Sequence, residues 1–319
     1  MFEISARTKV VVLGSLVFDI AVTVDRVPET DETVLASSVQ ISAGGKGLCQ
    51  AVAARRLGAS VDAIGLVGSD VFGEYLISVL KAEDIGHEHV RTHDAGTHLG
   101  IPIVTPDGNN RIIGIPRASF AVAPDDVASS VELLQAADVL LLQGETPLES
   151  IRAAVERVGQ ETLVVWNPAP ARFTLEEMLA GQFGDRISWL TPNESEATTL
   201  TGLLVVDVET GIRAARSIHE RFPTTAVVVT LGAQGSVAIE RDGALHVAAP
   251  FRVAAVDPTA AGDSFSAAFA VALANGASVA EALSFASAAG ALTATRLGAV
   301  TAIPHVTQVR ALVDEGAHP

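Results

Sequence analysis

The sequence predicts an α/β fold with a mostly parallel sheet, helices on both of its faces and a second, smaller sheet. From residue 139 onward, apolar β-branched runs alternate with helical patterns, which is typical of a parallel sheet whose strands are joined by helices. Extra strand-like runs early in the chain interrupt this alternation and indicate a separate small sheet. No Pro/Ser linker, internal repeat or low-complexity tract divides the 319 residues. We therefore expect one domain, 1–319, with a lid whose strands lie at about 17–43 and 98–118.

The first third of the chain contributes strands to both sheets. Residues 9–16 form an apolar, β-branched run, as expected for a buried parallel strand. The runs 48–57 and 71–82 have helical periodicity, and Gly58 ends the first of them. Asp107 and Gly108, within P-D-G-N-N, are a strong hairpin signal. The other strands predicted here are 20–24, 34–41, 61–67, 101–105 and 111–115.

The rest of the chain contains the regular alternation. Strands are predicted at 139–143, 163–166, 187–190 and 226–231, with helices between them at 148–158, 175–181, 194–201 and 208–221. A second hairpin is predicted across R-D-G, between 236–239 and 244–248. The last predicted helices are 265–274, 279–296 and 305–315.

Composition excludes several classes of protein. Hydrophobic residues make up 49% of the chain and aromatic residues only 4%, which indicates an interior rich in Ala, Val and Leu. A net charge of −16 and a pI near 4.8 argue against nucleic acid or an anionic membrane as partner. One cysteine excludes an internal disulfide framework. The N-terminus lacks a signal-peptide pattern, and no run reaches the ~18 apolar residues of a membrane span. We expect a soluble cytoplasmic protein.

The stretch 256–269 is the strongest candidate for a reactive site. Small residues, Ala260, Ala261 and Gly262, directly precede Asp263 and an apolar helical run. Unpaired N–H groups at such a helix start, with the helix dipole behind them, favour a phosphate, and small side chains let it approach. Asp263 is then either the base that takes a proton from an attacking hydroxyl, or an acidic first-turn residue favoured by the dipole.

Three further motifs each have two interpretations. Gly44–Gly47 (G-G-K-G) is a flexible turn or a close backbone approach to a polar ligand, and it lacks the spacing of a Walker A loop. Asn193 and Glu196 form a helix capping box, or they place a carboxylate near a nucleotide's Mg²⁺. The segment 230–235, with two glycines, is a tight turn or a loop under a nucleotide. The absence of G-x-G-x-x-G argues against a dinucleotide dehydrogenase.

The histidines allow a metal-site hypothesis that the sequence does not favour. His87, His89 and His93 lie close together, with His98 just behind them. Their spacing also fits the solvated edge of a strand, which we consider the better interpretation. Cys49 has no basic partner placed by the sequence, so a catalytic thiolate is not expected.

Six short blocks occur in order between residue 10 and about residue 304. They are G-S-L-V-F-D (14–19), G-G-K-G (44–47), N-P-A-P-A (167–171), T-P-N-E-S-E (191–196), T-L-G-A-Q-G (230–235) and D-P-T-A-A-G-D-S-F (257–265). Together they resemble the ribokinase-like PfkB carbohydrate kinase family. The resemblance implies a Rossmann-like three-layer α/β/α sandwich with a small β-sheet lid, which often forms a homodimer interface.

The resemblance also implies an activity. The expected reaction is ATP-dependent transfer of the γ-phosphate to the primary hydroxyl of a pentose, with D-ribose as first candidate. Alternatives are 2-deoxyribose, another sugar or a nucleoside and, more remotely, a catalytically silent sugar- or nucleotide-binding protein. Asp263, Gly262 and Glu196 are all present, which argues against the silent protein.

Residue roles follow from the matched blocks. Asp263 would be the base, with Ala260, Ala261 and Gly262 as the anion hole. The sugar would contact Asp19, Gly45, Lys46 and Glu145. ATP would contact Asn193, Thr230, Leu231, Gly232, Ala233, Gln234, Gly235 and Gly262, with Glu196 organising Mg²⁺ indirectly. A potassium site would lie at Asp257, Thr259, Thr293, Arg296, Gly298 and Ala302, mostly through carbonyl oxygens.

The sequence departs from the family pattern at four positions within or near the matched blocks. Val17 and Cys49 stand where ribokinases usually place sugar-contacting asparagines. Pro258 replaces a threonine and Ala260 a glycine. If Val17 faces the ring, ribose should lose part of its advantage over a sugar with one hydroxyl fewer, such as 2-deoxyribose. Alternatively, Val17, Phe18 and Cys49 form an apolar wall for a bulkier group, such as a nucleoside base. The chemistry is therefore better defined than the substrate.

Overall fold

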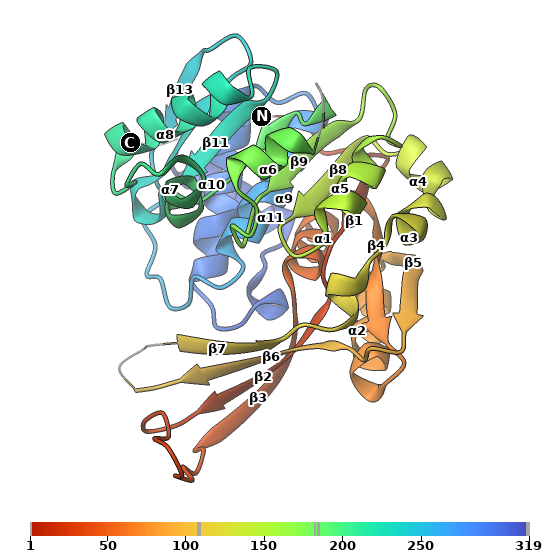
Figure 1. Cartoon of the computed structure of the whole chain (residues 1–319). Helices are drawn as coiled ribbons and strands as arrows, with labels where there is room; N and C mark the ends of the chain where they lie inside the picture. Colours follow the sequence, from red (N-terminus) through yellow and green to blue (C-terminus); the bar gives the residue numbers. More distant parts are fainter. Residues whose placement is uncertain (1, 107–109, 182, 184–185, 317–319) are drawn as a thin grey trace.

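A nine-stranded sheet forms the centre of the protein in the computed structural model, which describes residues 2–106, 110–181, 183 and 186–316 (Figure 1). Within that part of the chain, the strand order is β13-β12-β11-β10-β9-β8-β1-β4-β5. Neighbours from β5 to β11 are parallel, and β12 and β13 add an antiparallel edge. The strands are β1 Lys9–Leu13, β4 Ser60–Gly68, β5 Gly86–His93, β8 Val139–Gln143, β9 Leu163–Asn167, β10 Trp189–Leu190, β11 Ala226–Thr230, β12 Ser236–Ile239 and β13 Leu245–Ala248.

Helices cover both faces of this sheet, so the predicted three-layer sandwich is confirmed. Alternate residues of β1 lie in two different cores: Val10 and Val12 in one, Val11 and Leu13 in the other. The first core packs under α1 Lys46–Arg56, α2 Val71–Ala82, α9 Ala261–Ala274, α10 Val279–Ala294 and α11 Val306–Gly316. The second packs under α3 Pro124–Ala128, α4 Val131–Gln135, α5 Leu148–Val155, α6 Leu175–Ala180, α7 Glu194–Thr201 and α8 Val208–Arg221. None of the described helices is long and apolar enough to cross a membrane.

A second sheet, here called the small sheet, extends from the sandwich beside α1 and α2 (Figure 1). Its order is β3-β2-β6-β7, with β2 and β6 parallel and the outer pairs antiparallel. Its strands are β2 Val17–Thr23, β3 Ser38–Gly44, β6 His98–Val104 and β7 Asn110–Ile115. They come from the two early parts of the chain in which extra strands were expected.

The two faces of the small sheet differ in chemistry because side chains alternate along each strand. One face carries Val17, Asp19, His98, Gly100 and Gly114 and lines a cavity described below. Phe18 lies on the opposite face and packs against Phe72 and Tyr75 of α2, with ring centroids 4.7 and 5.2 Å away. The expectation that Phe18 belongs to an apolar wall beside the substrate is therefore wrong.

Several element boundaries differ from the prediction. The first strand ends at Leu13, because the chain passes at Gly14 from the large sheet to β2, which starts at Val17 instead of residue 20. Helix α1 starts at Lys46, two residues early, since Gly45, which lies between β3 and the helix, turns the chain with a φ of 90°. Helices α3 and α4 have five residues each and are too short to give a periodic signal. The turn residues predicted at Asp107 and Gly108 lie outside the described residues.

Candidate active site

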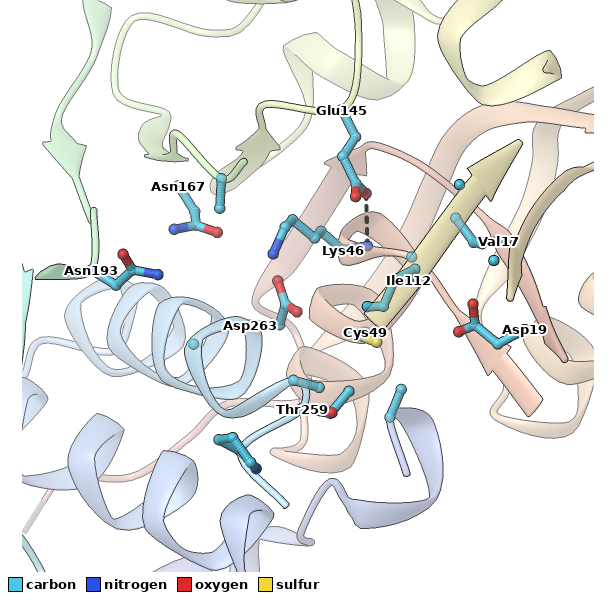
Figure 2. Close-up of a pocket in the computed structure, with 18 of the residues that line it drawn as sticks. Val17, Asp19, Lys46, Cys49, Ile112, Glu145, Asn167, Asn193, Thr259 and Asp263 are labelled. Atoms are coloured by element: carbon cyan, nitrogen blue, oxygen red, sulfur yellow. Dashed lines mark hydrogen bonds between the residues drawn. The ribbon is translucent and has the colours of Figure 1, made fainter. Parts of the chain in front are cut away.

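A cavity of about 550 Å³ lies between the carboxyl ends of the large sheet's strands and the inner face of the small sheet (Figure 2). Glu145, Asn167 and Thr230 line it from the ends of β8, β9 and β11. Among the predicted site residues, it is lined by Val17, Asp19, Gly45, Lys46, Cys49, Glu145, Asn193, Glu196, Thr230, Thr259, Ala260, Gly262 and Asp263. The cavity is thus lined both by the residues expected to contact the sugar and by some of those expected to contact ATP, namely Asn193, Thr230 and Gly262.

The start of α9 presents backbone donors to this cavity. Ala260 adopts the left-handed conformation, with φ 61° and ψ 7°, and begins the helix without a side-chain cap. Within the described chain, the N–H groups of Gly262 and Asp263 have no acceptor. Gly262 and Asp263 both line the cavity, and a Cβ added at Gly262 would meet nothing within 4 Å, so the first turn of α9 borders open space. A non-glycine residue at positive φ stores strain and is characteristic of a functional loop.

Asp263 lies at the floor of the cavity and is 6% exposed. Its Oδ1 accepts a hydrogen bond of 3.0 Å from Gln50 Nε2, and Gln50 Oε1 accepts one of 2.7 Å from Gln143 Nε2. Burial raises the pKa of Asp263, although Lys46 and the bond from Gln50 oppose this shift. The two amides orient a carboxylate whose raised pKa makes it a stronger base.

The glycines of G-G-K-G are explained by close contacts at the start of α1. A Cβ at Gly47 would lie 2.6 Å from Gly14 Cα, and one at Gly44 would lie 2.0 Å from Asp19 Oδ2. Lys46 between them donates its backbone N–H to Glu145 Oε2 at 3.0 Å (Figure 2). Burial lowers the pKa of the Lys46 amine, but Asp263, Glu145 and Glu196 raise it, and the net shift is upward. The segment is a packed turn that holds a charged lysine in the cavity.

Asp19 is the main polar group of the small sheet's inner face. Its carboxylate fits between Gly44 and Gly100, where an added Cβ would come within 2.0 Å of an Asp19 oxygen in either case. Burial, with a smaller contribution from Glu145, raises the pKa of Asp19 to about 6. Glu145 itself accepts a hydrogen bond from the Ser15 hydroxyl. Two carboxylates therefore face one end of the cavity, where they can accept hydrogen bonds from a ligand.

The other end of the cavity carries the capping box at the start of α7. Asn193 Oδ1 accepts from the Glu196 N–H, and Glu196 Oε2 accepts from the Asn193 N–H, both at 2.9 Å. Glu196 is 7% exposed, and burial raises its pKa. Since both residues also line the cavity, the capping and the ligand-binding interpretations describe the same side chains.

The predicted nucleotide loop after β11 lies partly outside the cavity. Leu231 is buried in the second core, whereas Gly232, Ala233 and Gln234 are exposed in a short 3₁₀ turn. Gly235 has a φ of 94°, and a Cβ there would lie 2.0 Å from Ala248 O, so this glycine allows the turn to pack on β13. Only backbone and exposed atoms of this loop are available to a ligand that extends beyond the cavity.

The two segments predicted to hold potassium meet each other beside the start of α9. The Asp257 carboxylate accepts from the N–H groups of Thr259 and Gly298, each at 3.0 Å. Thr293 is buried, with its hydroxyl 2.8 Å from Ser264 Oγ, and Arg296 is exposed. Of the residues predicted to bind potassium, only Thr259 lines the cavity in the described part of the chain; Asp257, Thr293, Arg296, Gly298 and Ala302 do not, and neither does Ala261 of the predicted anion hole.

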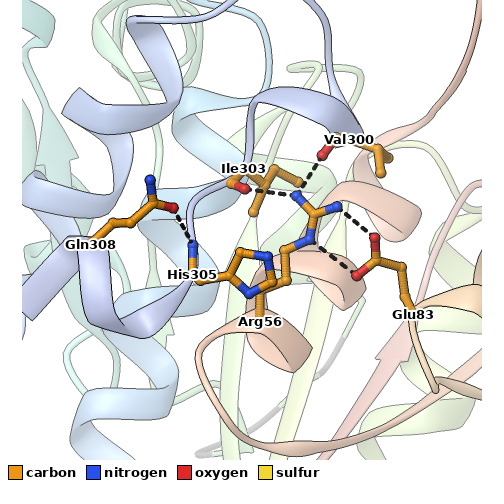
Figure 3. Close-up of polar contacts among 6 residues, drawn as sticks. All are labelled: Arg56, Glu83, Val300, Ile303, His305 and Gln308. Atoms are coloured by element: carbon orange, nitrogen blue, oxygen red, sulfur yellow. Dashed lines mark hydrogen bonds and ion pairs between the residues drawn. The ribbon is translucent and has the colours of Figure 1, made fainter.

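A guanidinium group holds the second of these segments in place. Arg56, the last residue of α1, donates to Val300 O at 3.0 Å and Ile303 O at 2.7 Å (Figure 3). The same side chain is paired with Glu83, at the end of α2. The backbone around Ala302 is thus fixed to two helices.

Sequence reasoning missed part of the cavity wall. His98, Gly100, Gly114 and Phe120 line it, and none was expected to bind substrate. The first three reach the cavity because β6 pairs with β2, and β7 with β6. Phe120 reaches it from a short 3₁₀ turn at Ala118–Ala121. No local sequence pattern predicts that these residues line the cavity. Once the pairing of β6 with β2 is known, the alternation of side chains places His98 and Gly100 on the cavity face.

The comparisons with known proteins agree with one family. A family model described as "pfkB family carbohydrate kinase" matches residues 7–306. The chain is 36% identical to a ribokinase of Haemophilus influenzae over 300 residues, which is 93% of this chain and 96% of that protein. It is 33% identical to a deoxyribokinase of Salmonella typhimurium over 304 residues, or 94% of this chain and 96% of that one.

Solved structures give the same result. A ribokinase from Thermotoga maritima is similar at a TM-score of 0.85 with 31% identity, over 96% of this chain and 99% of that one. A ribokinase from Arabidopsis thaliana, complexed with ribose and ATP, is similar at a TM-score of 0.84 with 29% identity, over the same shares of both chains.

Proposed function

Because the chain belongs to the pfkB family of carbohydrate kinases, we propose that it transfers the γ-phosphate of ATP to the primary hydroxyl of D-ribose, giving ribose 5-phosphate. The observation that carries this proposal is the position of Asp263. It is a buried carboxylate on the first turn of α9, beside unpaired N–H groups and between the two ends of the cavity. A structural capping residue would need no such position, whereas a base acting on a hydroxyl beside a phosphate does.

The proposed mechanism uses these groups together. Asp263 accepts the proton of the primary hydroxyl as its oxygen attacks the γ-phosphorus, and ADP leaves with the bond to the β-phosphate oxygen broken. The N–H groups of Gly262 and Asp263 then bind the oxygens of the transferring phosphoryl group, at the positive end of the helix. Asp19, Gly45, Lys46 and Glu145 hold the sugar so that its hydroxyl lies at Asp263.

We propose that ATP extends from Asn193 and Thr230 across the exposed turn Gly232–Gln234 to Gly235. Mg²⁺ bound to the phosphates would neutralise part of their charge. Glu196 fits an indirect role in holding that ion. Among the described residues, its carboxylate accepts hydrogen bonds only from Asn193, at 2.9 and 3.0 Å, and it has lone pairs left for water ligands. Leu231 contributes only its backbone.

A monovalent cation, potassium, is proposed between the segments around Asp257–Thr259 and Thr293–Ala302. The ligands would be carbonyl oxygens rather than the Asp257 carboxylate, because both of its oxygens already accept hydrogen bonds from N–H and hydroxyl donors. Such an ion would stabilise the backbone next to the anion hole without contacting substrate. Turnover measured in potassium, sodium and Tris buffers tests the proposed potassium site. Equal rates in all three buffers would refute it.

We further propose that the small sheet is a lid and a homodimer interface. Its outer face is apolar, with Val39 63%, Ile41 56% and Ile113 53% exposed. Apolar side chains that recur on one face of a sheet favour association with a second copy of that face. Since ATP is the phosphoryl donor, we place the enzyme in the cytoplasm.

A second candidate substrate is 2-deoxyribose, for which Val17 and Cys49 provide the specific observation. Both are buried in the cavity wall, at 7% and 2% exposure, and burial raises the pKa of the Cys49 thiol well above its ordinary value. Neither side chain is a strong hydrogen-bond partner, so a hydroxyl placed against them would lose its bond to water, at a cost of about 1–3 kcal/mol. A nucleoside would also tolerate this wall.

ADP release coupled to a panel of acceptors tests the proposed function. We expect kcat/KM to be highest for ribose among ribose, 2-deoxyribose, fructose, adenosine and pseudouridine. Val17→Asn should then shift the preference further from 2-deoxyribose towards ribose. A protein that binds sugar and ATP but releases no ADP would be a sensor rather than a kinase.

A further inference from the structure

His98 has a different environment from the other histidines near it in the sequence. His87, His89 and His93 lie on β5, the edge strand of the large sheet. His98 begins β6 in the small sheet, directly opposite Val17 of β2 in the parallel register. Its side chain therefore emerges on the inner face, where it lines the cavity together with Val17, and the hypothesis of one histidine cluster does not apply to it.

The imidazole of His98 is buried and lacks a partner. His98 is 7% exposed, and within the described part of the chain its Nδ1 is inaccessible to solvent and takes part in no hydrogen bond, which leaves Nε2 as the ring nitrogen that can face the cavity. Burial lowers the pKa of His98, against a weaker opposite influence of Glu145, so the ring is neutral at pH 7. A neutral imidazole offers one donor and one acceptor, and buried polar atoms are almost always satisfied by protein, water or ligand.

The His98 ring packs against an aromatic neighbour. His98 packs against Phe120 with ring centroids 5.1 Å apart and an interplanar angle of 52°. The guanidinium of Arg172 lies over the same Phe120 ring, 4.4 Å from its centroid. The His98 ring thus packs against Phe120, which Arg172 contacts in turn, and such aromatic and cation–π contacts favour this arrangement of the three side chains.

We propose that His98 contacts the substrate directly, hydrogen-bonding a sugar hydroxyl that lies over Val17. This rests on the proposed kinase function and specifies its substrate as a sugar that keeps this hydroxyl. Val17 provides no hydrogen-bonding group on its own strand, and His98 provides one from the neighbouring strand at the same level of the sheet. Phe120 and Arg172 act as positioning residues for the ring.

His98→Phe tests the contact, because phenylalanine keeps an aromatic ring against Phe120 and removes both ring nitrogens. Ribose and its 1-, 2- and 3-deoxy analogues are compared by kcat/KM and by calorimetric Kd. We expect the variant to lose about 5- to 100-fold in kcat/KM for ribose, mainly through KM. For the one analogue that lacks the contacted hydroxyl, the variant should match the wild type within about twofold, which also identifies that hydroxyl.

Two variants and a control complete the design. Val17→Asn introduced into His98→Phe should restore part of the ribose affinity, since an amide then stands opposite position 98. His98→Asn should retain more ribose affinity than His98→Phe. His93→Phe, on an exposed residue of β5, should leave all constants unchanged, and melting temperatures show whether each variant folds.

The outcomes separate this inference from the function on which it rests. If His98→Phe resembles wild type with every sugar, or loses the same factor with all of them, His98 is not a substrate contact although the kinase function stands. If the wild-type protein releases no ADP with any of these sugars, the proposed function fails, and the His98 contact fails with it.

Discussion

Single side chains decide the proposed chemistry, and Asp263 is the first to test. Asp263→Asn keeps an acceptor for Gln50 but removes the proposed base, so kcat should fall by about 10²–10⁴ with the ATP KM nearly unchanged. Steady-state kinetics of purified protein gives both constants. Asp125→Asn, on exposed α3, is the matched control. A variant of Asp263 with near wild-type turnover would reduce this residue to a helix cap.

Asp19 makes substrate binding depend on pH. Its pKa is raised from an ordinary 3.8 to about 6, so below that pH it is protonated and loses acceptor capacity for sugar hydroxyls. We expect sugar affinity, measured by calorimetry, to weaken as pH falls through about 6, and Asp19→Asn to abolish that dependence. Burial also raises the pKa of Asp62, which does not line the cavity. The variant Asp62→Asn should therefore keep the pH dependence of sugar affinity.

The same shift has a consequence for stability. A carboxyl group whose pKa is higher folded than unfolded binds its proton more tightly in the folded state. Its ionisation therefore costs stability, a cost that is absent below about pH 4 and complete above about pH 6. Asp19→Asn should raise the melting temperature more at pH 8 than at pH 5. The opposite trend would contradict the raised pKa.

At the scale of elements, helix α1 connects two parts of the proposed site. Its first residue, Lys46, lies in the cavity, and its last, Arg56, binds the carbonyls of Val300 and Ile303. That loop continues through the bond of Gly298 to Asp257, and Asp257 in turn binds Thr259 next to the anion hole. A change at one end of α1 can therefore alter the backbone at the start of α9.

Arg56→Met should loosen this connection. We expect kcat to fall about tenfold, because small displacements of catalytic groups are costly, and the potassium concentration for half-activation to rise. Amide hydrogen exchange should increase at 298–303 and also at 257–260, which Arg56 does not touch. Arg55→Met is the matched control, since Arg55 pairs with Asp84 at the same helix end but does not touch this loop. Exchange that rises only at 300–303 would refute the connection.

Element boundaries were predictable where the signal is local. Helices α2 and α8 begin and end where the sequence predicts, because Asp70 and Asp207 cap them and accept the N–H groups of Gly73 and Thr210. The contacts of His98 were not predictable. They depend on the pairing of β2 with β6, two strands far apart in the chain, and on a ring supplied by a turn without periodicity.

At the scale of the whole molecule, the outer face of the small sheet is the feature to test. Charges at Ile41 and Ile113, both more than half exposed, should prevent the proposed association of two copies. Sedimentation is expected to show a dimer for the wild type and a monomer for the Ile41→Glu, Ile113→Glu variant. Leu204→Glu places a charge on a still more exposed residue away from this sheet, and this variant should remain dimeric. A wild-type monomer would remove the proposed interface.

The alternation of β2 places Asp19 on one face of the small sheet, and the next residue, Ile20, on the other. If both faces are used as proposed, the sugar and the second subunit contact different side chains of β2, but these side chains belong to the same backbone. By thermodynamic reciprocity, if sugar binding strengthens the association of the two subunits, then association strengthens sugar binding by the same factor. If that coupling is favourable, the dissociation constant for sugar would rise as the enzyme is diluted, because dilution separates the subunits.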